Sequence, residues 1–267
     1  MALQSIRPIK LIRPMSRGSS RPQLIRFSNR RRYVVKFKNN GVQGTRALVN
    51  EYVAGKLART LHLPVPRFRV VYIPKKFIKK KRKLRRHRFK PGRQFASRFI
   101  PGGISHVRKL PPRSKIVNRQ QLAGILVFDQ WVNNVDRLKR NILVKKTSRR
   151  KRYKIYMIDH GHSFSQHRPP NRPNCRWTPR TLKRLPRTLQ PNPFYRWCWS
   201  QVKSPDEILQ FVTRIEKIPN RRIRRIIRSI PKDWNVSRKE KKSLYLYLIR
   251  TKKKIRRLMT KQIKKRL

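Results

Sequence analysis

Acidic residues are scarce in this sequence. Only nine of its 267 residues are Asp or Glu, against 75 Lys and Arg, so the formal net charge is +66 at pH 7. A basic motif has little meaning against such a background, whereas each carboxylate stands out from it. The few carboxylates are therefore the most informative positions in the chain.

Cysteines and long apolar runs are also few. The two cysteines, Cys175 and Cys198, form no CxxC motif and no ligand cluster, which argues against a disulfide scaffold or structural zinc and is typical of a reducing compartment. The longest apolar run, residues 122–128, is far too short to span a bilayer. These features predict a cytoplasmic protein with no transmembrane segment, although the Arg-rich first fifty residues leave a transit peptide open.

Enough apolar residues are present for a folded core. Hydrophobic residues make up 37% of the chain, and they include five Trp, eight Tyr and eleven Phe. We therefore expect a folded protein that carries its charge on the surface and depends on salt, counterions or a polyanionic partner. Nonspecific binding of polyanions is also expected, because neutralising phosphates requires no specific site. Charge alone does not identify the function.

The first half of the chain predicts a small β-rich unit. Strands are expected at 9–12, 23–27, 33–38 and 68–73. A helix is expected from a Thr45 cap to about Leu61, after a turn at residues 39–41. Residues 75–93 are a basic insertion, for which a solvated mobile loop, an RNA-binding arm and a nuclear signal are the alternatives, the loop being the ordinary one.

The second half predicts a mainly helical unit. A helix capped by Asn118 with Gln121 is expected to reach about Asn133 and to be followed by strands. We expect strands at 142–144 and 153–158, an irregular segment at 165–200, and helices starting near 204 and 237. Between these two helices, Ile223, Ile226, Ile227 and Ile230 repeat the helical spacing. We divide the chain into an N-lobe of residues 1–105 and a C-lobe of residues 106–267.

Three polar residues of the second half have the spacing of a phosphotransferase site. Asp136 precedes Asn141 by five positions, between a helix and a strand, as in the D-x-x-x-x-N of a kinase catalytic loop. There the Asp accepts a hydroxyl proton and the Asn amide oxygen binds a metal. Asp159 follows the strand at 153–158 in an IDHG sequence, where a carboxylate can bridge Mg²⁺ and phosphate oxygens. Each residue alone could simply cap a turn.

The first half supplies matching groups for phosphates. Lys36 lies within an expected strand, and Glu51 lies fifteen residues later in the following helix, where the two can pair. A GSSRP turn at 18–22 offers the backbone N–H groups of Gly18, Ser19 and Ser20, with two hydroxyls, in place of a Gly-rich loop. Taken alone, Lys36 is one of many basic residues, so its assignment depends on Glu51.

These segments resemble the short stand-alone HipA-like kinases. The segments that match in order are GSSRP, YVVKF, LVNEYVAGKLA, LPVP, GILVFDQWVNN, DRLKRN and MIDHGHSF. The resemblance is dense at 18–73 and 118–164, looser in the C-terminal helices and absent at 75–93. The extreme positive charge departs from the family pattern.

The resemblance implies an α+β, two-lobe, protein-kinase-like fold with ATP and Mg²⁺ bound between the lobes. It implies that Lys36 contacts the α- and β-phosphates, that Glu51 orients Lys36, and that Asp136 is the catalytic base. Asn141 and Asp159 would hold the magnesium. The expected reaction is transfer of the γ-phosphate to a hydroxyl, a Ser or Thr of a protein, with the basic surface recruiting a substrate bound to tRNA or another polyanion.

Several residues keep a structural alternative. Asp129 shares a helix face with apolar residues, so we expect a buried pair with a loop arginine that supports the site. The histidines beside Asp159, His160 and His162, lack further ligands at zinc spacing. The aromatic residues between 176 and 199 could stack on bases or belong to the core. The competing function is a basic nucleic-acid-binding protein on a catalytically inactive kinase-like scaffold.

Overall fold

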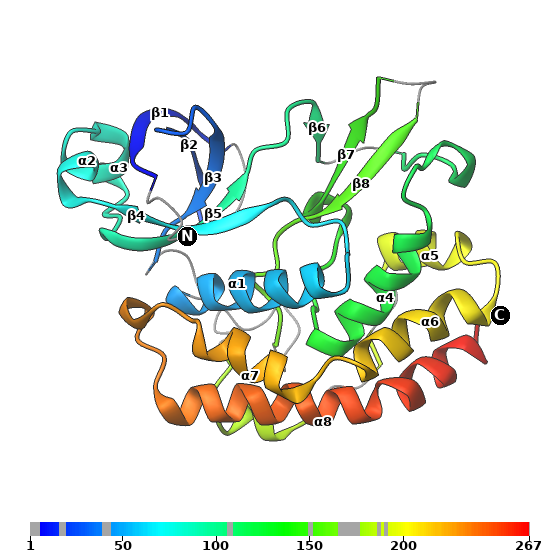
Figure 1. The fold of residues 1–267 in the computed structure, drawn as a ribbon. Coiled ribbons are helices and arrows are strands. Elements are labelled where there is room, and N and C mark those ends of the chain that lie inside the picture. Colours follow the sequence, from blue (N-terminus) through cyan, green and yellow to red (C-terminus); the bar gives the residue numbers. More distant parts are fainter. Residues whose placement is uncertain are drawn as a thin grey trace.

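A computed structural model describes most of the chain. The described ranges are residues 6–15, 20–38, 44–105, 109–148, 152–164, 177–185, 188–189 and 192–266. Two β-sheets lie above a layer of helices in the view of Figure 1, with the N-terminal residues in the larger sheet and the C-terminal helix at the base. This arrangement confirms the predicted α+β class with a β-rich N-terminal part and a helical C-terminal part.

The larger sheet has five antiparallel strands in the order β1-β2-β3-β5-β4. Their bounds are β1 Pro8–Pro14, β2 Gln23–Phe27, β3 Arg32–Lys36, β4 Phe68–Ile73 and β5 Gly92–Arg98. Tyr33 and Val35 of β3 point into the core of this sheet, as the alternation of the strand requires. Lys36 is the last residue of β3 rather than the middle of a strand, and it lies opposite Phe95.

The basic insertion is folded against this sheet. It forms the short helices α2 (Lys75–Lys79) and α3 (Arg82–Arg86), and the side chains of Ile78, Leu84 and Phe89 are buried. The Phe89 ring stacks on Phe37 with the ring centroids 4.2 Å apart. The interpretation of residues 75–93 as a solvated loop is therefore wrong, because the long run of charge concealed an apolar face that the sheet buries.

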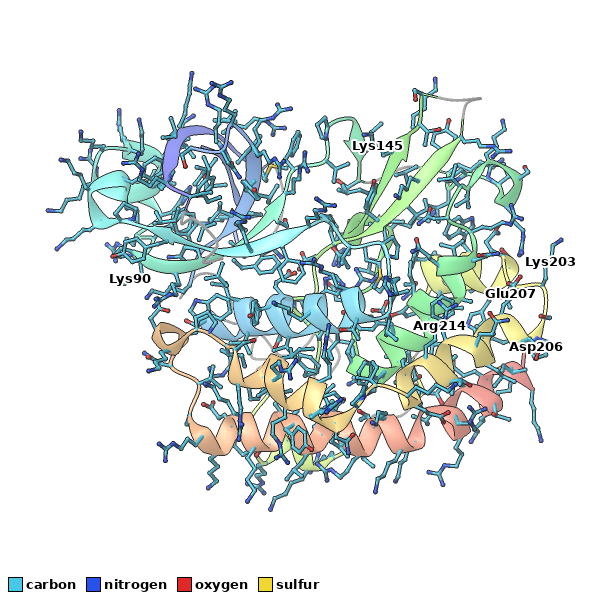
Figure 2. All side chains as sticks on the ribbon, viewed as in Figure 1. Lys90, Lys145, Lys203, Asp206, Glu207 and Arg214 are labelled. Atoms are coloured by element: carbon cyan, nitrogen blue, oxygen red, sulfur yellow. The ribbon has the colours of Figure 1, made fainter. Side chains whose placement is uncertain are left out.

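A second, three-stranded sheet carries the middle of the chain. Its antiparallel strands are β6 (Gly103–Ile104), β7 (Ile142–Lys146) and β8 (Tyr153–Met157), in that order. Basic side chains project outward around both sheets in Figure 2, where Lys145 of β7 and Lys90 near the end of the insertion are labelled. The expected surface location of the charge is thus seen at these positions.

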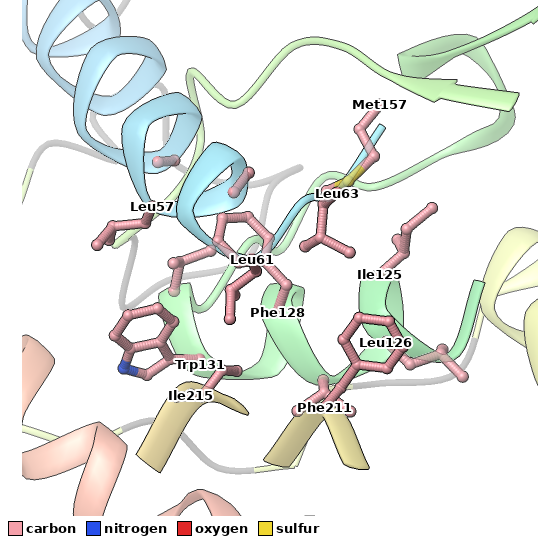
Figure 3. Packing of buried hydrophobic residues seen from close by; sticks show 14 of the residues in the cluster. Leu57, Leu61, Leu63, Ile125, Leu126, Phe128, Trp131, Met157, Phe211 and Ile215 are labelled. Carbon is pink, nitrogen blue, oxygen red and sulfur yellow. The ribbon is translucent and has the colours of Figure 1, made fainter. Parts of the chain in front are cut away.

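The helical layer is built around α1 (Thr45–Thr60) and α4 (Gln120–Val132), in which most residues are buried. The other long helices are α5 Pro193–Ser200, α6 Pro205–Glu216, α7 Asn220–Arg228 and α8 Arg238–Ile263. The short 3₁₀ turns are Arg113–Lys115, Lys139–Asn141, Thr181–Lys183 and Lys232–Trp234. Apolar side chains of α1, α4 and α6 meet in one cluster, where Leu57, Phe128 and Phe211 are labelled in Figure 3. Burial of these groups is the main driving force that holds α1 against the C-terminal helices.

Helix starts follow the predicted signals only in part. Ser237 and Glu240 form the expected capping box of α8. Asn118 does not cap α4, because its side chain exchanges two hydrogen bonds with the backbone of Ile155 in β8. Similarly, Thr45 is the first residue of α1 rather than its cap. The turn predicted at residues 39–41 lies outside the described residues.

The segment predicted to be irregular is partly helical. Residues 165–176, 186–187 and 190–191 lie outside the described residues, but α5 begins after Asn192, whose side chain accepts a hydrogen bond from the backbone N–H of Tyr195. Trp177, Phe194 and Trp199 are buried in the main core. Their burial favours the core interpretation over base stacking. Within the described ranges, no helix has the length and apolar character needed to cross a membrane.

Candidate active site

Lys36 joins two carboxylates that come from distant parts of the chain. Its ammonium group lies 2.5 Å from Glu51 Oε1 of α1 and 2.8 Å from Asp159 Oδ1, which follows β8. The Glu51 side chain is buried, whereas that of Asp159 is 33% exposed. The structure therefore brings together the three groups that sequence spacing selected from the N-terminal and C-terminal halves.

The three charges hold one another in the ionised state. Burial favours the neutral form of each group, but mutual attraction outweighs it. The two carboxylates raise the pKa of Lys36, and Lys36 lowers the pKa of both Glu51 and Asp159 below their usual ranges. The site thus keeps a cation and two anions in a region largely shielded from water, which is suitable for binding a charged ligand.

Asp159 is presented by an unusual backbone conformation at the end of β8. Its φ is +57°, in the left-handed region that non-glycine residues seldom adopt. The backbone N–H of the preceding residue, Ile158, donates to the Asn141 carbonyl across 3.1 Å. Asn141 directly precedes β7, and Asp159 follows β8. Since Ile142 pairs with Met157 in the antiparallel β7–β8 ladder, Asn141 and Asp159 lie at the same end of the two strands. Local strain of this kind is common at functional sites.

Asp136 and Asn141 are joined within one loop. Asn141 Nδ2 donates to Asp136 Oδ2 at 3.0 Å and also to the Asp136 carbonyl. On the other side of the carboxylate, Arg140 Nη2 lies 3.1 Å from Asp136 Oδ1. Because Arg140 is about half exposed, this pair is weak and its guanidinium group can exchange with another anion.

Arg137 connects the loop that contains Asp136 to α4 and to the end of β8. Its side chain is fully buried and lies 2.9 Å from Asp129 Oδ2 of α4. It also donates to the Asn141 carbonyl at 2.9 Å and to the carbonyl of Ile158. The predicted buried pair between Asp129 and a loop arginine is therefore present. One guanidinium group connects α4, the loop and the residue before Asp159.

Two further contacts complete the surroundings of Asp129. Tyr195 of α5 donates its hydroxyl to Asp129 Oδ2 at 3.2 Å, and Asn134 donates to Oδ1 at 3.1 Å. Burial together with the Asp129 charge raises the pKa of Tyr195 well above its usual value, so the hydroxyl remains a donor. The sequence predicts a loop arginine as the partner of Asp129 but does not distinguish Arg137 from its basic neighbours, and it gives no sign that Tyr195 contacts Asp129, because aromatic residues are abundant in that segment.

The remaining predicted site residues are placed only in part. Gly18 and Ser19 of the GSSRP turn lie outside the described residues, whereas Ser20 lies three residues before the start of β2 and is partly buried. His160 is buried, with Nδ1 3.6 Å from Glu51 Oε2. In the described part of the chain, no group of three or more His, Cys, Asp or Glu side chains could hold a metal ion.

The donor groups of the site fit a magnesium ion that is coordinated by protein oxygens and by phosphate oxygens of a ligand. Mg²⁺ is usually held by one or two carboxylates, with phosphate oxygens and water completing the octahedron. Asp159 supplies a carboxylate, and the Asn141 amide nitrogen is turned toward Asp136, which leaves its amide oxygen for a cation. This small number of protein ligands suits a metal that arrives with a nucleotide better than a metal held by protein groups alone.

The paired carboxylates make stability depend on pH in acid. The ordinary pKa values are 4.5 for Glu51 and 3.8 for Asp159, and both fall in the folded state. Such a group contributes stability that is fully present above its unfolded pKa and is lost as the pH falls through its folded pKa. We therefore expect the Tm of the parent to decrease more steeply than that of Asp159→Asn between about pH 5 and pH 2. Parallel curves in thermal denaturation would show that Asp159 does not gain stability from Lys36.

Two protein-family models match this sequence. The sequence model of the family described as HipA-like kinase matches residues 9–172, and the model described as phosphatidylinositol 3- and 4-kinase matches residues 117–267. The first match includes Lys36, Glu51, Asp136, Asn141 and Asp159. No curated protein matches the chain in sequence.

Solved kinase structures share the fold of this chain. The proinflammatory kinase CtkA of Helicobacter pylori superimposes with a TM-score of 0.62 at 17% identity, covering 98% of this chain and 97% of that one. The Golgi casein kinase with Mn and ADP gives a TM-score of 0.53 at 13% identity, covering 93% and 73%. HipA from the HipA–HipB operator DNA complex of Shewanella oneidensis gives 0.52 at 13% identity, covering 97% and 73%. At these identities the similarity shows the two-lobe kinase-like fold.

Proposed function

This chain belongs to the HipA-like kinase family and has the fold of a phosphotransferase, and on that premise we propose that it transfers the γ-phosphate of ATP to a hydroxyl group with the help of Mg²⁺. The observation that supports the proposal most strongly is the contact of Lys36 with both Glu51 and Asp159. In protein kinases, a strand lysine paired with a helix glutamate and an aspartate that binds Mg²⁺ must both be in place for phosphoryl transfer, and Lys36, Glu51 and Asp159 match these three positions.

Lys36, Glu51 and Asp159 are assigned to the nucleotide. The Lys36 ammonium group would neutralise the α- and β-phosphates, and Glu51 would keep it pointed toward them. Asp159, with Asn141, would hold Mg²⁺, which supplies charge neutralisation at the phosphates when bound. The backbone N–H groups of Gly18, Ser19 and Ser20 would cover the phosphates. The nucleotide would bind between an N-lobe of residues 1–105 and a C-lobe of residues 106–267.

Asp136 is assigned to the acceptor. Its carboxylate would accept the proton of the attacking hydroxyl, and the hydrogen bond from Asn141 would fix its orientation. Arg140 now pairs with Asp136 Oδ1, and an incoming hydroxyl would displace it. The buried Asp129–Arg137 pair would fix the position of this loop relative to Asp159, because Arg137 donates hydrogen bonds to the carbonyls of Asn141 and Ile158.

The proposed acceptor is a Ser or Thr of a protein in the cytoplasm. One of the solved kinases with a similar fold is the Golgi casein kinase, which supports a protein substrate. The net charge of +66 favours substrates that are acidic or associated with tRNA or another nucleic acid. Nonspecific attraction of polyanions would then raise the local concentration of such substrates without forming part of the catalytic site.

A ligand-dependent stability measurement tests the nucleotide site. A ligand that binds only the folded state at 100 times its Kd stabilises the protein by about 2.7 kcal/mol. We expect ATP with Mg²⁺ to raise the Tm of the parent at moderate salt, and to do so much less in Asp159→Ala. Asp206→Ala, which removes an exposed carboxylate at the start of α6 (Figure 2), is the matched control and should respond like the parent. Equal stabilisation of all three proteins, or stabilisation that salt abolishes, would indicate nonspecific binding of ATP.

A further inference from the structure

A cavity lined with arginines lies where the end of α1 meets the start of α7. Its volume is about 470 Å³, and it is lined by Arg59, Thr60, His62, Pro219, Arg221, Arg222 and Arg225. We call this set the arginine groove. The helices α1 and α7 lie side by side in Figure 1 and pack against each other. The volume of the arginine groove falls within the range of about 300–1,000 Å³ that is usual for small-molecule sites.

The arginines of the groove have no carboxylate partner in the part of the chain that the structure describes. Among the described residues, none of the ion pairs includes Arg59, Arg221, Arg222 or Arg225. The scarce carboxylates elsewhere do pair with arginine, as Glu216 does with Arg256 and Glu207 with Arg113. Four guanidinium groups that share one cavity repel one another, and an anion among them would relieve that repulsion.

The walls of the groove are held in place by contacts outside it. At the α1 end, the His62 carbonyl accepts a hydrogen bond from Gln121 of α4 at 2.5 Å. At the α7 end, Lys252 of α8 donates to the Ile218 carbonyl at 2.8 Å and to Asn220 Oδ1 at 2.7 Å. A site whose backbone is already fixed loses less entropy when it binds a ligand.

The spacing of the arginines limits the kind of anion. Arg221 and Arg225 are one helical turn apart, so they share a face of α7 and lie about 6 Å apart along its axis. Each guanidinium group can bind a phosphate through two parallel N–H···O hydrogen bonds. Several such groups within one cavity match adjacent phosphates of a compact ligand better than the evenly spaced phosphates of an extended strand.

We propose that the arginine groove is a second anion site, separate from the candidate active site, which binds a compact polyphosphate. Arg59 lies eight residues after Glu51 on α1, which corresponds to about 12 Å along the helix. The groove therefore opens beyond the end of the helix that supplies Glu51. It does not depend on the proposed phosphotransfer, because none of its lining residues belongs to the cluster around Lys36.

Arginine footprinting in the absence of Mg²⁺ tests the location directly. The protein is treated with phenylglyoxal, with or without inorganic tripolyphosphate, and modification of each arginine is followed by mass spectrometry. We expect tripolyphosphate to slow modification of the four groove arginines several-fold and to leave the exposed Arg238 and Arg257 of α8 nearly unchanged. Uniform protection of all exposed arginines would overturn the proposal. Stronger protection by a single-stranded oligonucleotide at equal phosphate concentration would also overturn it.

Matched variants test the affinity. The triple variant Arg59→Gln, Arg221→Gln, Arg225→Gln removes three charges from the groove, and Lys253→Gln, Lys254→Gln, Arg257→Gln removes three exposed charges from α8. In calorimetric titration with tripolyphosphate, we expect the groove variant to raise Kd by about tenfold or more, because bonds between charged groups are lost. The α8 variant should retain the parent Kd within about twofold. Equal losses in the two variants would show that only net charge matters.

Discussion

Replacement of Asp136 by Asn is expected to reduce phosphotransfer by about 10²–10⁴-fold, which is the usual contribution of a general base. The amide has nearly the shape of the carboxylate but cannot accept the hydroxyl proton. The fold should remain intact, because Asp136 pairs with Arg140, which is about half exposed, and such pairs contribute about 1 kcal/mol or less. The variant thus separates chemistry from stability.

Rates of phosphate transfer from labelled ATP measure this effect. Asp206→Asn, at an exposed position of the first turn of α6, is the control for the loss of one acidic charge and should keep the parent rate. Both variants should unfold within about 1 kcal/mol of the parent. If Asp136→Asn retains most of the parent rate at matched stability, Asp136 is not the base and the loop has another role.

Replacement of Arg137 by Met is expected to destabilise the protein by about 3–5 kcal/mol, because it leaves Asp129 charged, buried and without its cation. Both side chains of this pair are 0% exposed. The substitution also removes the donors to the carbonyls of Asn141 and Ile158, which hold the loop against the end of β8. We therefore expect phosphotransfer to fall even under conditions in which the variant remains folded.

Equilibrium unfolding in urea measures the destabilisation, and the surface offers a matched control. Arg256 forms an ion pair with Glu216 in which the two side chains are 48% and 32% exposed, so Arg256→Met should cost no more than about 1 kcal/mol. The double substitution Asp129→Leu, Arg137→Met should recover part of the loss, since no charge is then left buried. Equal costs for Arg137→Met and Arg256→Met would contradict a supporting role for the buried pair.

The polar residues of the candidate site were predictable because acids are rare. In a chain with nine carboxylates, Asp136 and Asp159 could be singled out by their spacing from a helix, a loop and a strand. Pairing between Lys36 and Glu51 followed from one strand and one helix that are close in sequence. The contact of Lys36 with Asp159 spans 123 positions, and no local pattern predicts a contact between residues so far apart in sequence.

The abundance of basic residues made the buried arginine and the helices of the insertion hard to predict. Arg137 is chemically identical to its exposed neighbour Arg140, and only burial distinguishes the two. In the insertion at 75–93, apolar residues are separated by runs of Lys and Arg, so the helical period was not recognised, although Leu84 is fully buried. Likewise, α5 lies in a segment whose Pro content suggested irregular structure, whereas Pro193 occupies the first position of the helix, where proline is favourable.

Turnover of ATP by the parent protein tests the proposed activity most directly. The protein is incubated with γ-labelled ATP at moderate salt, with Mg²⁺ or with an excess of chelator, and labelled protein and released phosphate are quantified. Phosphotransferase activity predicts label transfer or ATP hydrolysis that requires Mg²⁺. Complete absence of autophosphorylation, ATP hydrolysis and substrate labelling in the folded parent would contradict it.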